Sequence, residues 1–427
     1  MLRRYRRPKL TSEPTEVAQS CVDRWKAKPR IAIVSPFLDK RHGTERCVAE
    51  QIERLAQDYE IHVYSSSIQD VDLSKIIWHR VLDLPGPHLA AYTWFFLANH
   101  FQRWWDGRFK GLDFDLVFSP GINCLDADII AVHIVFTEFY RVVHQELALL
   151  RNPVRMWPRL IHRKLSYHLF IALEHRLYAR DEIHLVVTSR KMEQDLERCF
   201  NRSSRMSLVY NGVNLDQMNP ARREGLREEA RRTLRLPEGA FAILLVGNDW
   251  RKKGLRCLIE AAGSLGIPHL WILVVGHDES SSFHDILRCN GLENRMTILP
   301  IVPHVELYYA AADMYAGPSL EDSFAIPPLE AMACGLPVIV SRQAGVSELV
   351  THGVDGFVLE DPTDSQLLAK LIHCIYESAD LRRNLGERAE ATARQYTWQR
   401  NAEEMKKIFE ERLREKRRDG FATSSQS

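Results

Sequence analysis

Residues 241–276 read FAILLVGNDWRKKGLRCLIEAAGSLGIPHLWILVVG, two apolar runs of strand length joined by a longer amphipathic segment. The runs FAILLVG (241–247) and LWILVVG (270–276) are apolar along almost their whole length. Such strands are typical of a parallel sheet, because helices cover both of its faces. The stretch therefore predicts a βαβ unit and an α/β fold.

The same alternation recurs on both sides of this unit. Between the earlier and the later series of strands, NGVNLDQMNPARREG (211–225) is rich in turn formers and charge and predicts an interdomain linker. We expect two doubly wound, Rossmann-like domains, with the ligand in the crevice outside the carboxyl ends of their strands. The other predicted strands are IAIVSPF (31–37), IHVYS (61–65), DLVFS (115–119), IIAVH (129–133), HLVVTS (184–189), MTILP (296–300), MYAGPS (314–319), LPVIVS (336–341) and GFVLE (356–360).

Four segments follow from this pattern. Residues 1–28 form a polar, basic and mobile tail, 29–213 the first Rossmann-like domain, 214–394 the second, and 395–427 a C-terminal helix and tail. That helix can pack back on the first domain. Its last part, KKIFEERLREKRRDG (406–420), exchanges apolar residues for charge, and we expect it to fray into solvent.

Composition excludes several classes of protein. The chain has 427 residues, 57 Lys and Arg against 56 Asp and Glu, and a net charge of +1, which argues against a nucleic-acid partner. Its eight cysteines are dispersed without a C-x-x-C pair, so neither a zinc site nor a disulfide scaffold is expected. With no run of 18 apolar residues, we expect a cytoplasmic protein, at most peripheral to a membrane.

The most informative stretch for function is PSLEDSFAIPPLEAMACGLPVIVS (318–341). Two consecutive prolines and a later glycine predict a short helix whose N-terminus points at the top of the sheet, where its dipole favours a phosphate. Asp322 and Glu330 supply carboxylates, which can bind vicinal hydroxyls of a sugar. Alternatively, Glu330 only stabilises its own helix and Asp322 only caps a turn.

This stretch resembles the E-x7-E signature of retaining GT-B glycosyltransferases of glycosyltransferase family four. The resemblance extends in the same order over roughly residues 30 to 400, and the WRKKG and HGTERCVAEQIERLA segments are most similar to enzymes that glucosylate a lipopolysaccharide core heptose. The other matching segments are HGTER (42–46), ADIIAVH (127–133), VVTSRKMEQDL (186–196), LVYNGVNLDQMNP (208–220), LLVGNDWRKKGLRCLIEAA (244–262) and AGVSELVTHGVDGFVLEDPTD (344–364).

The resemblance implies roles for the E-x7-E residues. Glu330 binds the nucleotide sugar, and the backbone N–H groups of Phe324 and Ala325 point at the sugar. The first acid of the signature is Asp322 here, with Glu321 beside it, so either carboxylate could fill that position. Ala325 stands where the family usually has glycine.

The turn GNDWRKKG (247–254) carries three consecutive basic residues. The resemblance implies that a basic pair in this turn holds the diphosphate and stabilises the leaving group, and we assign Arg251 and Lys253 because residues two apart can converge across a tight turn. A cluster of lysines can equally be an ordinary solvated surface.

Three residues of the first domain complete the predicted site. Gly43 lies in the first strand-to-helix loop, where a missing Cβ lets backbone approach a phosphate, or it is a plain turn glycine. His133 ends a predicted strand, and the resemblance implies a contact to sugar or acceptor, although strand-end histidines are often structural. Asp126 is a weaker candidate for holding an acceptor hydroxyl, and Glu348 is interpreted as a helix-start residue.

The implied reaction is transfer of a hexose from a nucleotide sugar, with UDP-sugars favoured, to a hydroxyl of a glycan or lipid-linked glycan, with retention of configuration. No cofactor or metal is expected, because the three D-x-D triplets lack a third ligand nearby and basic side chains replace the metal in this class. The alternative is a catalytically silent GT-B protein that binds a sugar nucleotide or a partner.

Residues 141–180 contain eight Arg or Lys against two acids, and AAYTWFFLANHFQRWW (90–105) is rich in aromatic residues. This mixture suits an interfacial segment on anionic lipid, so we hypothesise that the first domain docks on the cytoplasmic leaflet of a membrane. Alternatively, these are ordinary helices that pack on the core of the domain.

Overall fold

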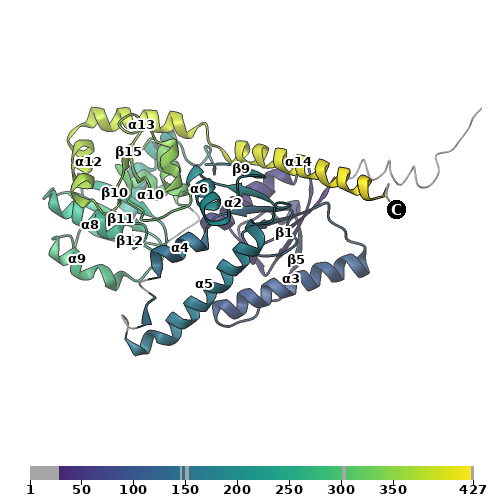
Figure 1. Cartoon of the computed structure of the whole chain (residues 1–427). Helices are drawn as coiled ribbons and strands as arrows, with labels where there is room; N and C mark the ends of the chain where they lie inside the picture. Colours follow the sequence, from purple (N-terminus) through teal and green to yellow (C-terminus); the bar gives the residue numbers. More distant parts are fainter. Residues whose placement is uncertain (1–27, 145–146, 150–152, 301–303, 425–427) are drawn as a thin grey trace, which may run out of the picture.

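The computed structural model describes residues 28–144, 147–149, 153–300 and 304–424, and the predicted tail, apart from Lys28, lies outside the described residues. Two parallel sheets lie side by side, each in its own domain (Figure 1). The first has the order β5 (Ile77–Arg80), β3 (Glu60–Ser65), β1 (Arg30–Val34), β6 (Leu116–Pro120), β7 (Ile129–Val132), β8 (His184–Val187) and β9 (Met206–Leu208).

The second sheet is built in the same way. Its register pairs Leu244 of the central strand with Leu273 on one side and Tyr315 on the other. Both strand series are present, so the predicted fold class, two Rossmann-like α/β domains, is confirmed. The order is β12 (Met296–Leu299), β11 (Leu270–Val275), β10 (Phe241–Val246), β13 (Met314–Gly317), β14 (Val338–Ser341) and β15 (Phe357–Leu359).

Helices cover both faces of the first sheet. On one face, side chains of α2 (Gly43–Leu55) and α14 (Trp398–Ser424) pack with Ile31 and Ile33 of β1. On the other face, α5 (Trp157–Tyr178) and α6 (Arg190–Phe200) pack with Ala32 and Val34. This alternation explains why residues 31–34 of β1 are all apolar. The same face carries α3 (His88–Lys110), and α4 (Phe136–Val143) follows β7.

The second sheet is covered in the same manner. Its two apolar clusters contain alternate residues of β10, Ile243 and Leu245 on one face and Ala242 and Leu244 on the other. The helices of the first of these faces are α8 (Leu255–Ser264), α9 (His284–Cys289) and α12 (Ser365–Glu377), and those of the second are α7 (Pro220–Thr233), α10 (Glu306–Ala311), α11 (Ile326–Ala333) and α13 (Ala379–Ala393).

The chain passes between the domains twice, and the two crossings are packed on each other. Val213 and Thr397 form a parallel bridge, with the N–H of Val213 donating to the carbonyl of Tyr396 at 3.0 Å. A Cβ on Gly212 would overlap the backbone of Trp398, so only glycine fits there. Because α7 already begins at Pro220, the predicted linker over 211–225 is too long at its end.

The C-terminal helix returns to the first domain, as Figure 1 shows in yellow. Met405 and Phe409 are buried in the core that contains β1. Further along, Leu413 is buried and the Lys416 ammonium lies 2.9 Å from the Asp128 carboxylate. The expectation that 406–420 frays is therefore wrong, because its few apolar and basic side chains have partners on the first domain.

Candidate active site

The basic turn after β10 is pressed against the loop that follows β13. Gly254 has a φ of +78°, and a Cβ there would overlap the carbonyl oxygen of Pro318. The stem of Lys253 lies across Gly247, which also lacks a Cβ, and its ammonium forms an ion pair with Asp322. The two loops meet at the carboxyl ends of adjacent strands, where a Rossmann-like domain binds its ligand.

The neighbouring lysine points elsewhere. The Lys252 ammonium lies 2.7 Å from the carboxylate of Asp249 and 3.9 Å from the ring centre of Phe139 in the first domain. Arg251 is exposed on the turn. The structure thus brings Lys253 to the loop of Asp322 and holds Lys252 against the facing domain.

The two adjacent acids face different partners. Asp322 accepts from the N–H of Phe324 at 3.4 Å, in addition to its pair with Lys253. Glu321 lies 3.7 Å from the ammonium of Lys191 on α6, and burial raises the pKa of its carboxyl. Asp322 therefore belongs with the basic turn, whereas Glu321 reaches across the crevice to the first domain.

Helix α11 begins directly after this loop, as the prolines predict. Phe324 is buried and Ala325 precedes the helix with a φ of +68°. That conformation costs an alanine about 1–2 kcal/mol and glycine almost nothing. The family's usual glycine is thus explained by the backbone, and this chain keeps the same backbone with alanine at a cost in stability.

Glu330 is not free in the structure. Its side chain is 3% exposed, one oxygen lies 2.6 Å from the guanidinium of Arg46 on α2, and the other accepts from the hydroxyl of Tyr309 at 2.6 Å. Burial lowers the pKa of Arg46, but Glu330 more than compensates, so this pKa is raised. The carboxylate predicted to bind the nucleotide sugar therefore pairs with the first domain, because a buried acid requires a counter-charge.

His133 directly follows β7 at its carboxyl end, on the crevice side of the first sheet. Its Nε2 atom is buried and has no hydrogen-bond partner among the described residues. Burial lowers the pKa of His133 to about 4, so the imidazole is neutral. Gly43 starts α2 on the same side, and a Cβ on it would meet no atom within 4 Å, so the space beside it is open.

Asp126 lies at the opposite edge of the first sheet from His133. It precedes the amino end of β7, whereas His133 follows the carboxyl end, and parallel strands place these ends at opposite edges of the sheet. Both of its carboxylate oxygens accept from Arg103 of α3, at 2.6 and 2.7 Å. The structure thus separates Asp126 from the other predicted site residues and gives its carboxylate a partner within its own domain.

Glu348, which the sequence predicts at a helix start, also makes a contact between the domains. Glu348 accepts from the N–H groups of Arg190 and Lys191 at 2.9 and 3.0 Å, and from the hydroxyl of Tyr210 at 3.1 Å. It therefore caps the N-terminus of α6 across the crevice, as well as lying in the first turn of its own short 3-10 helix (Gly345–Leu349). The described residues contain no group of three His, Cys, Asp or Glu side chains arranged to hold a metal ion.

Comparison with known proteins identifies the chain. Residues 41–217 match the model described as Glycosyltransferase Family 4, and residues 227–392 match the one described as Glycosyl transferases group 1. The two matches follow each other along the two domains. The chain belongs to the GT-B glycosyltransferases of family four. The family resemblance stated from the motifs is thus confirmed.

Two solved structures share the fold. WaaG, a glycosyltransferase involved in lipopolysaccharide biosynthesis, superposes with a TM-score of 0.72 at 19% identity over 89% of this chain and 99% of its own. HepE of Anabaena, solved in complex with UDP-glucose, gives 0.69 at 19% identity over 90% and 99%.

The curated relatives match only part of this chain. D-inositol 3-phosphate glycosyltransferase of Corynebacterium jeikeium is 31% identical over 243 residues, which cover 53% of this chain and 57% of the relative. The enzyme of the same name from Thermobifida fusca is 32% identical over 197 residues, covering 43% and 44%. The chain thus spans about half the length of the curated relatives it matches.

Proposed function

We propose that this family-four protein transfers a hexose from a nucleotide sugar to a hydroxyl of a glycan or glycolipid acceptor, with retention of configuration and without a metal ion. The observation that carries the proposal is the pairing of Lys253 with Asp322 at the carboxyl ends of β10 and β13, next to the start of α11. A basic side chain, a carboxylate and a helix N-terminus in one crevice suit a diphosphate bonded to a sugar.

In the proposed reaction, Lys253 exchanges Asp322 for the diphosphate when the donor binds. Arg251 adds a second positive charge from the same turn. Together with the N-terminal dipole of α11, these cations stabilise the negative charge that develops on the leaving phosphate oxygen, which a metal ion would otherwise do. The Asp322 carboxylate is then available to a sugar hydroxyl.

The acceptor oxygen attacks the anomeric carbon on the face from which the nucleoside diphosphate leaves. The bond from that carbon to the phosphate oxygen breaks, and the departing phosphate takes the proton of the acceptor hydroxyl. His133, neutral because its pKa is about 4, offers its Nε2 as a hydrogen-bond donor or acceptor to the sugar or the acceptor. The backbone N–H groups of Phe324 and Ala325 are the proposed contacts on the other side of the sugar.

Donor binding also requires a change at Glu330. Its carboxylate is held by Arg46 from the facing domain, so binding of ribose hydroxyls to Glu330 requires the guanidinium to withdraw. We therefore propose that the donor enters when the domains separate and that Arg46 is displaced toward the donor phosphates, beside Gly43 at the start of the same helix.

The names of similar proteins guide the choice of substrates. Solved complexes of HepE contain UDP and UDP-glucose, which favours a UDP-sugar donor. WaaG acts in lipopolysaccharide biosynthesis, and the curated relatives are named for D-inositol 3-phosphate. We propose a role in synthesis of cell-envelope polysaccharide or lipopolysaccharide at the cytoplasmic face of the membrane, with inositol phosphate as the acceptor to test beside glycolipids.

The test is a transfer assay with mass detection of product. Purified protein is incubated with UDP-, GDP- and ADP-hexoses, with and without EDTA, and with core oligosaccharide, lipid-linked glycan or D-inositol 3-phosphate. We expect one donor to be consumed, EDTA to have no effect, and a product with the anomeric configuration of the donor. Lys253→Ala should lose activity, whereas the matched Lys252→Ala should retain it.

Two results would contradict the proposal. Activity that Lys253→Ala leaves unchanged would remove the assigned site. Tight binding of a nucleotide sugar, seen by calorimetry, with neither transfer nor hydrolysis of any donor would instead favour the catalytically silent binding protein.

A further inference from the structure

Helix α3 buries three polar side chains, together with Phe95, and turns most of its aromatic side chains outward. Asn99, Arg103 and Asp106 are buried against the first domain, at 0%, 7% and 1% exposure. The large apolar residues point the other way, with Phe101 and Trp104 about 60% exposed. A surface helix of a globular protein normally shows the opposite arrangement. The exposed members of this face, with the segment before the helix, are Leu82, Leu84, Trp94, Leu97, Phe101, Trp104, Trp105 and Phe109.

Polar bonds fix the helix in this orientation. Asp106 accepts from the hydroxyl of Tyr64 on β3 at 2.9 Å, and Arg103 donates twice to Asp126. The Asn99 amide donates to the carbonyls of Phe95 and Asn123 within the domain. The sequence therefore places three buried polar anchors where apolar residues would suffice for folding, and the aromatic face is left outward.

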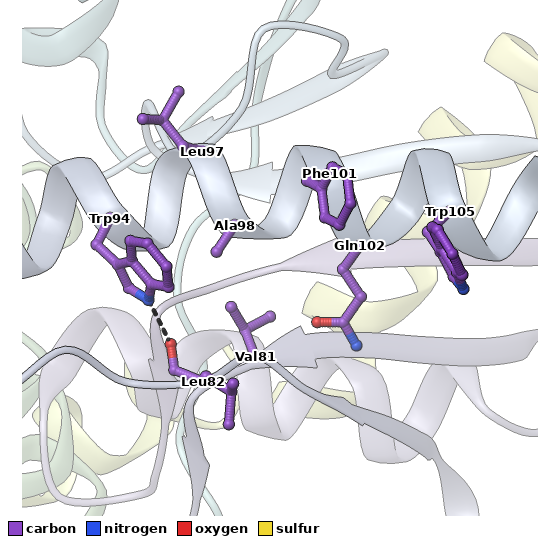
Figure 2. A pocket seen from close by; sticks show the side chains of 8 residues that line it. All are labelled: Val81, Leu82, Trp94, Leu97, Ala98, Phe101, Gln102 and Trp105. Carbon is purple, nitrogen blue, oxygen red and sulfur yellow. Dashed lines mark hydrogen bonds between the residues drawn. The ribbon is translucent and has the colours of Figure 1, made fainter.

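The outward side chains form one continuous surface. The rings of Trp105 and Phe109 lie 4.2 Å apart, and Phe101 is 5.8 Å from Trp104. Beside them, a groove of about 550 Å³ runs between the helix and Leu82. Figure 2 shows Trp94 at one end of the groove, donating its indole N–H to the Leu82 carbonyl, and Trp105 at the other. Its lining is apolar except for Gln102.

The exposed charges on α3 and on its neighbour α5 are positive. Helix α5 packs beside α3, where the backbone N–H of Leu89 donates to His162, and both helices lie on the side of the domain away from α14 (Figure 1). The only acids on the two helices are Asp106 and Glu174, and both are buried. The exposed basic side chains of the two helices are Arg108, Lys110, Arg159, Arg163 and Arg176.

We propose that the aromatic face of α3 docks onto an anionic lipid bilayer, with its groove holding an acyl chain. Several tryptophans on one helix, an apolar groove and two neighbouring helices whose exposed charges are all basic match the interface of such a membrane, although Asp83 is exposed between Leu82 and Leu84. None of the helices in the described part of the chain is long and apolar enough to cross a membrane, so this contact is a surface contact. The proposal is independent of the transfer activity, because it concerns binding alone.

The test is co-sedimentation with vesicles of phosphatidylcholine, with and without phosphatidylglycerol. We expect binding to the anionic vesicles that weakens as salt rises, and quenching of tryptophan fluorescence by lipids brominated on the acyl chain. Phe101→Ser/Trp104→Ser should reduce binding more than tenfold. The control Ile298→Ser/Leu367→Ser removes two exposed apolar side chains from the second domain and should bind like the wild type.

Charge reversal tests whether the basic side chains of α5 contribute to binding. Arg159→Glu/Arg163→Glu should weaken binding to anionic vesicles more than tenfold, whereas Arg383→Glu/Arg388→Glu on α13 should not. Circular dichroism verifies that each variant is folded. Equal binding by the wild type and the α3 variant would overturn the proposal. So would a concentration-dependent dimer that the α3 variant dissolves, because a second copy would then cover the face.

Discussion

The contact between Arg46 and Glu330 makes a quantitative prediction about how the two domains are held together. Arg46→Met removes the guanidinium that lies 2.6 Å from a carboxylate only 3% exposed, and leaves the Tyr309 hydroxyl as its remaining partner. Breaking a buried ion pair in this way costs about 3–5 kcal/mol, because the other charge stays buried. We therefore expect the free energy of unfolding to fall by about that amount.

A double-mutant cycle isolates the pair. Glu330→Gln keeps a side chain that accepts from Tyr309 and removes the charge, so combining it with Arg46→Met should recover about 2–4 kcal/mol of the loss. The matched control is Arg256→Met on α8. Arg256 lies 3.0 Å from Glu260 one turn away, but both side chains are accessible to solvent, at 76% and 34% exposure, so its loss should cost less than about 1 kcal/mol.

Urea unfolding followed by tryptophan fluorescence measures these values, since Trp250 and Trp398 are fully buried. Glu330→Gln is expected to be better tolerated than Arg46→Met. A cost for Arg46→Met no larger than that for Arg256→Met, or a coupling energy below about 0.5 kcal/mol, would refute the reasoning, because the buried carboxylate would then not depend on the first domain.

Three other predictions concern residues of the site. Lys253→Ala should lower kcat about 100-fold or more, while Lys252→Ala, whose ammonium faces Asp249 and Phe139 in the structure, should stay within about fivefold in the same transfer assay. Because burial lowers the pKa of His133 to about 4, the unfolded chain binds a proton before the folded chain does as the pH falls below about 6.5. The wild type should therefore lose about 3 kcal/mol of unfolding free energy by pH 4. His133→Gln should not show this loss, and urea titrations at each pH measure the difference. Ala325→Gly should raise the unfolding free energy by up to about 1 kcal/mol, because glycine adopts the positive φ of this position without strain. Ala331→Gly inside α11 should instead lower it by about 1 kcal/mol. Equal effects of the two variants on the melting temperature would contradict this account.

Much of the fold was predictable because buried parallel strands are apolar along their length. The strands missed from the sequence are short, and two of them, β5 and β9, lie at the edges of the first sheet. Residues 77–80 read IWHR, and three of these four side chains are exposed, so no apolar run marks the strand. Likewise, the start of α7 was hidden in a linker, although an asparagine N-cap followed by proline at 219–220 signals a helix start.

The meeting of Lys253 with Asp322 was predictable, because adjacent strands bring the loops that follow them together. Lys253 and Asp322 follow adjacent strands, and the rule for carboxyl ends places them side by side. The partner of Glu330 was not predictable, because Arg46 lies in the other domain and no local pattern specifies how two domains face each other. The position of Asp126 away from His133 was not predictable for a related reason, since its loop returns to the amino edge of the sheet before β7 begins.

The double crossing between the domains determines how they can move. Since the segments around Val213 and Thr397 are bridged and Gly212 is packed against Trp398, the first crossing cannot bend while the second stays rigid. The two segments that connect the domains therefore act as one hinge, and α14 is fixed to the first domain beyond them. Any opening of the two domains therefore has to bend both segments together, at the point where Val213 meets Thr397.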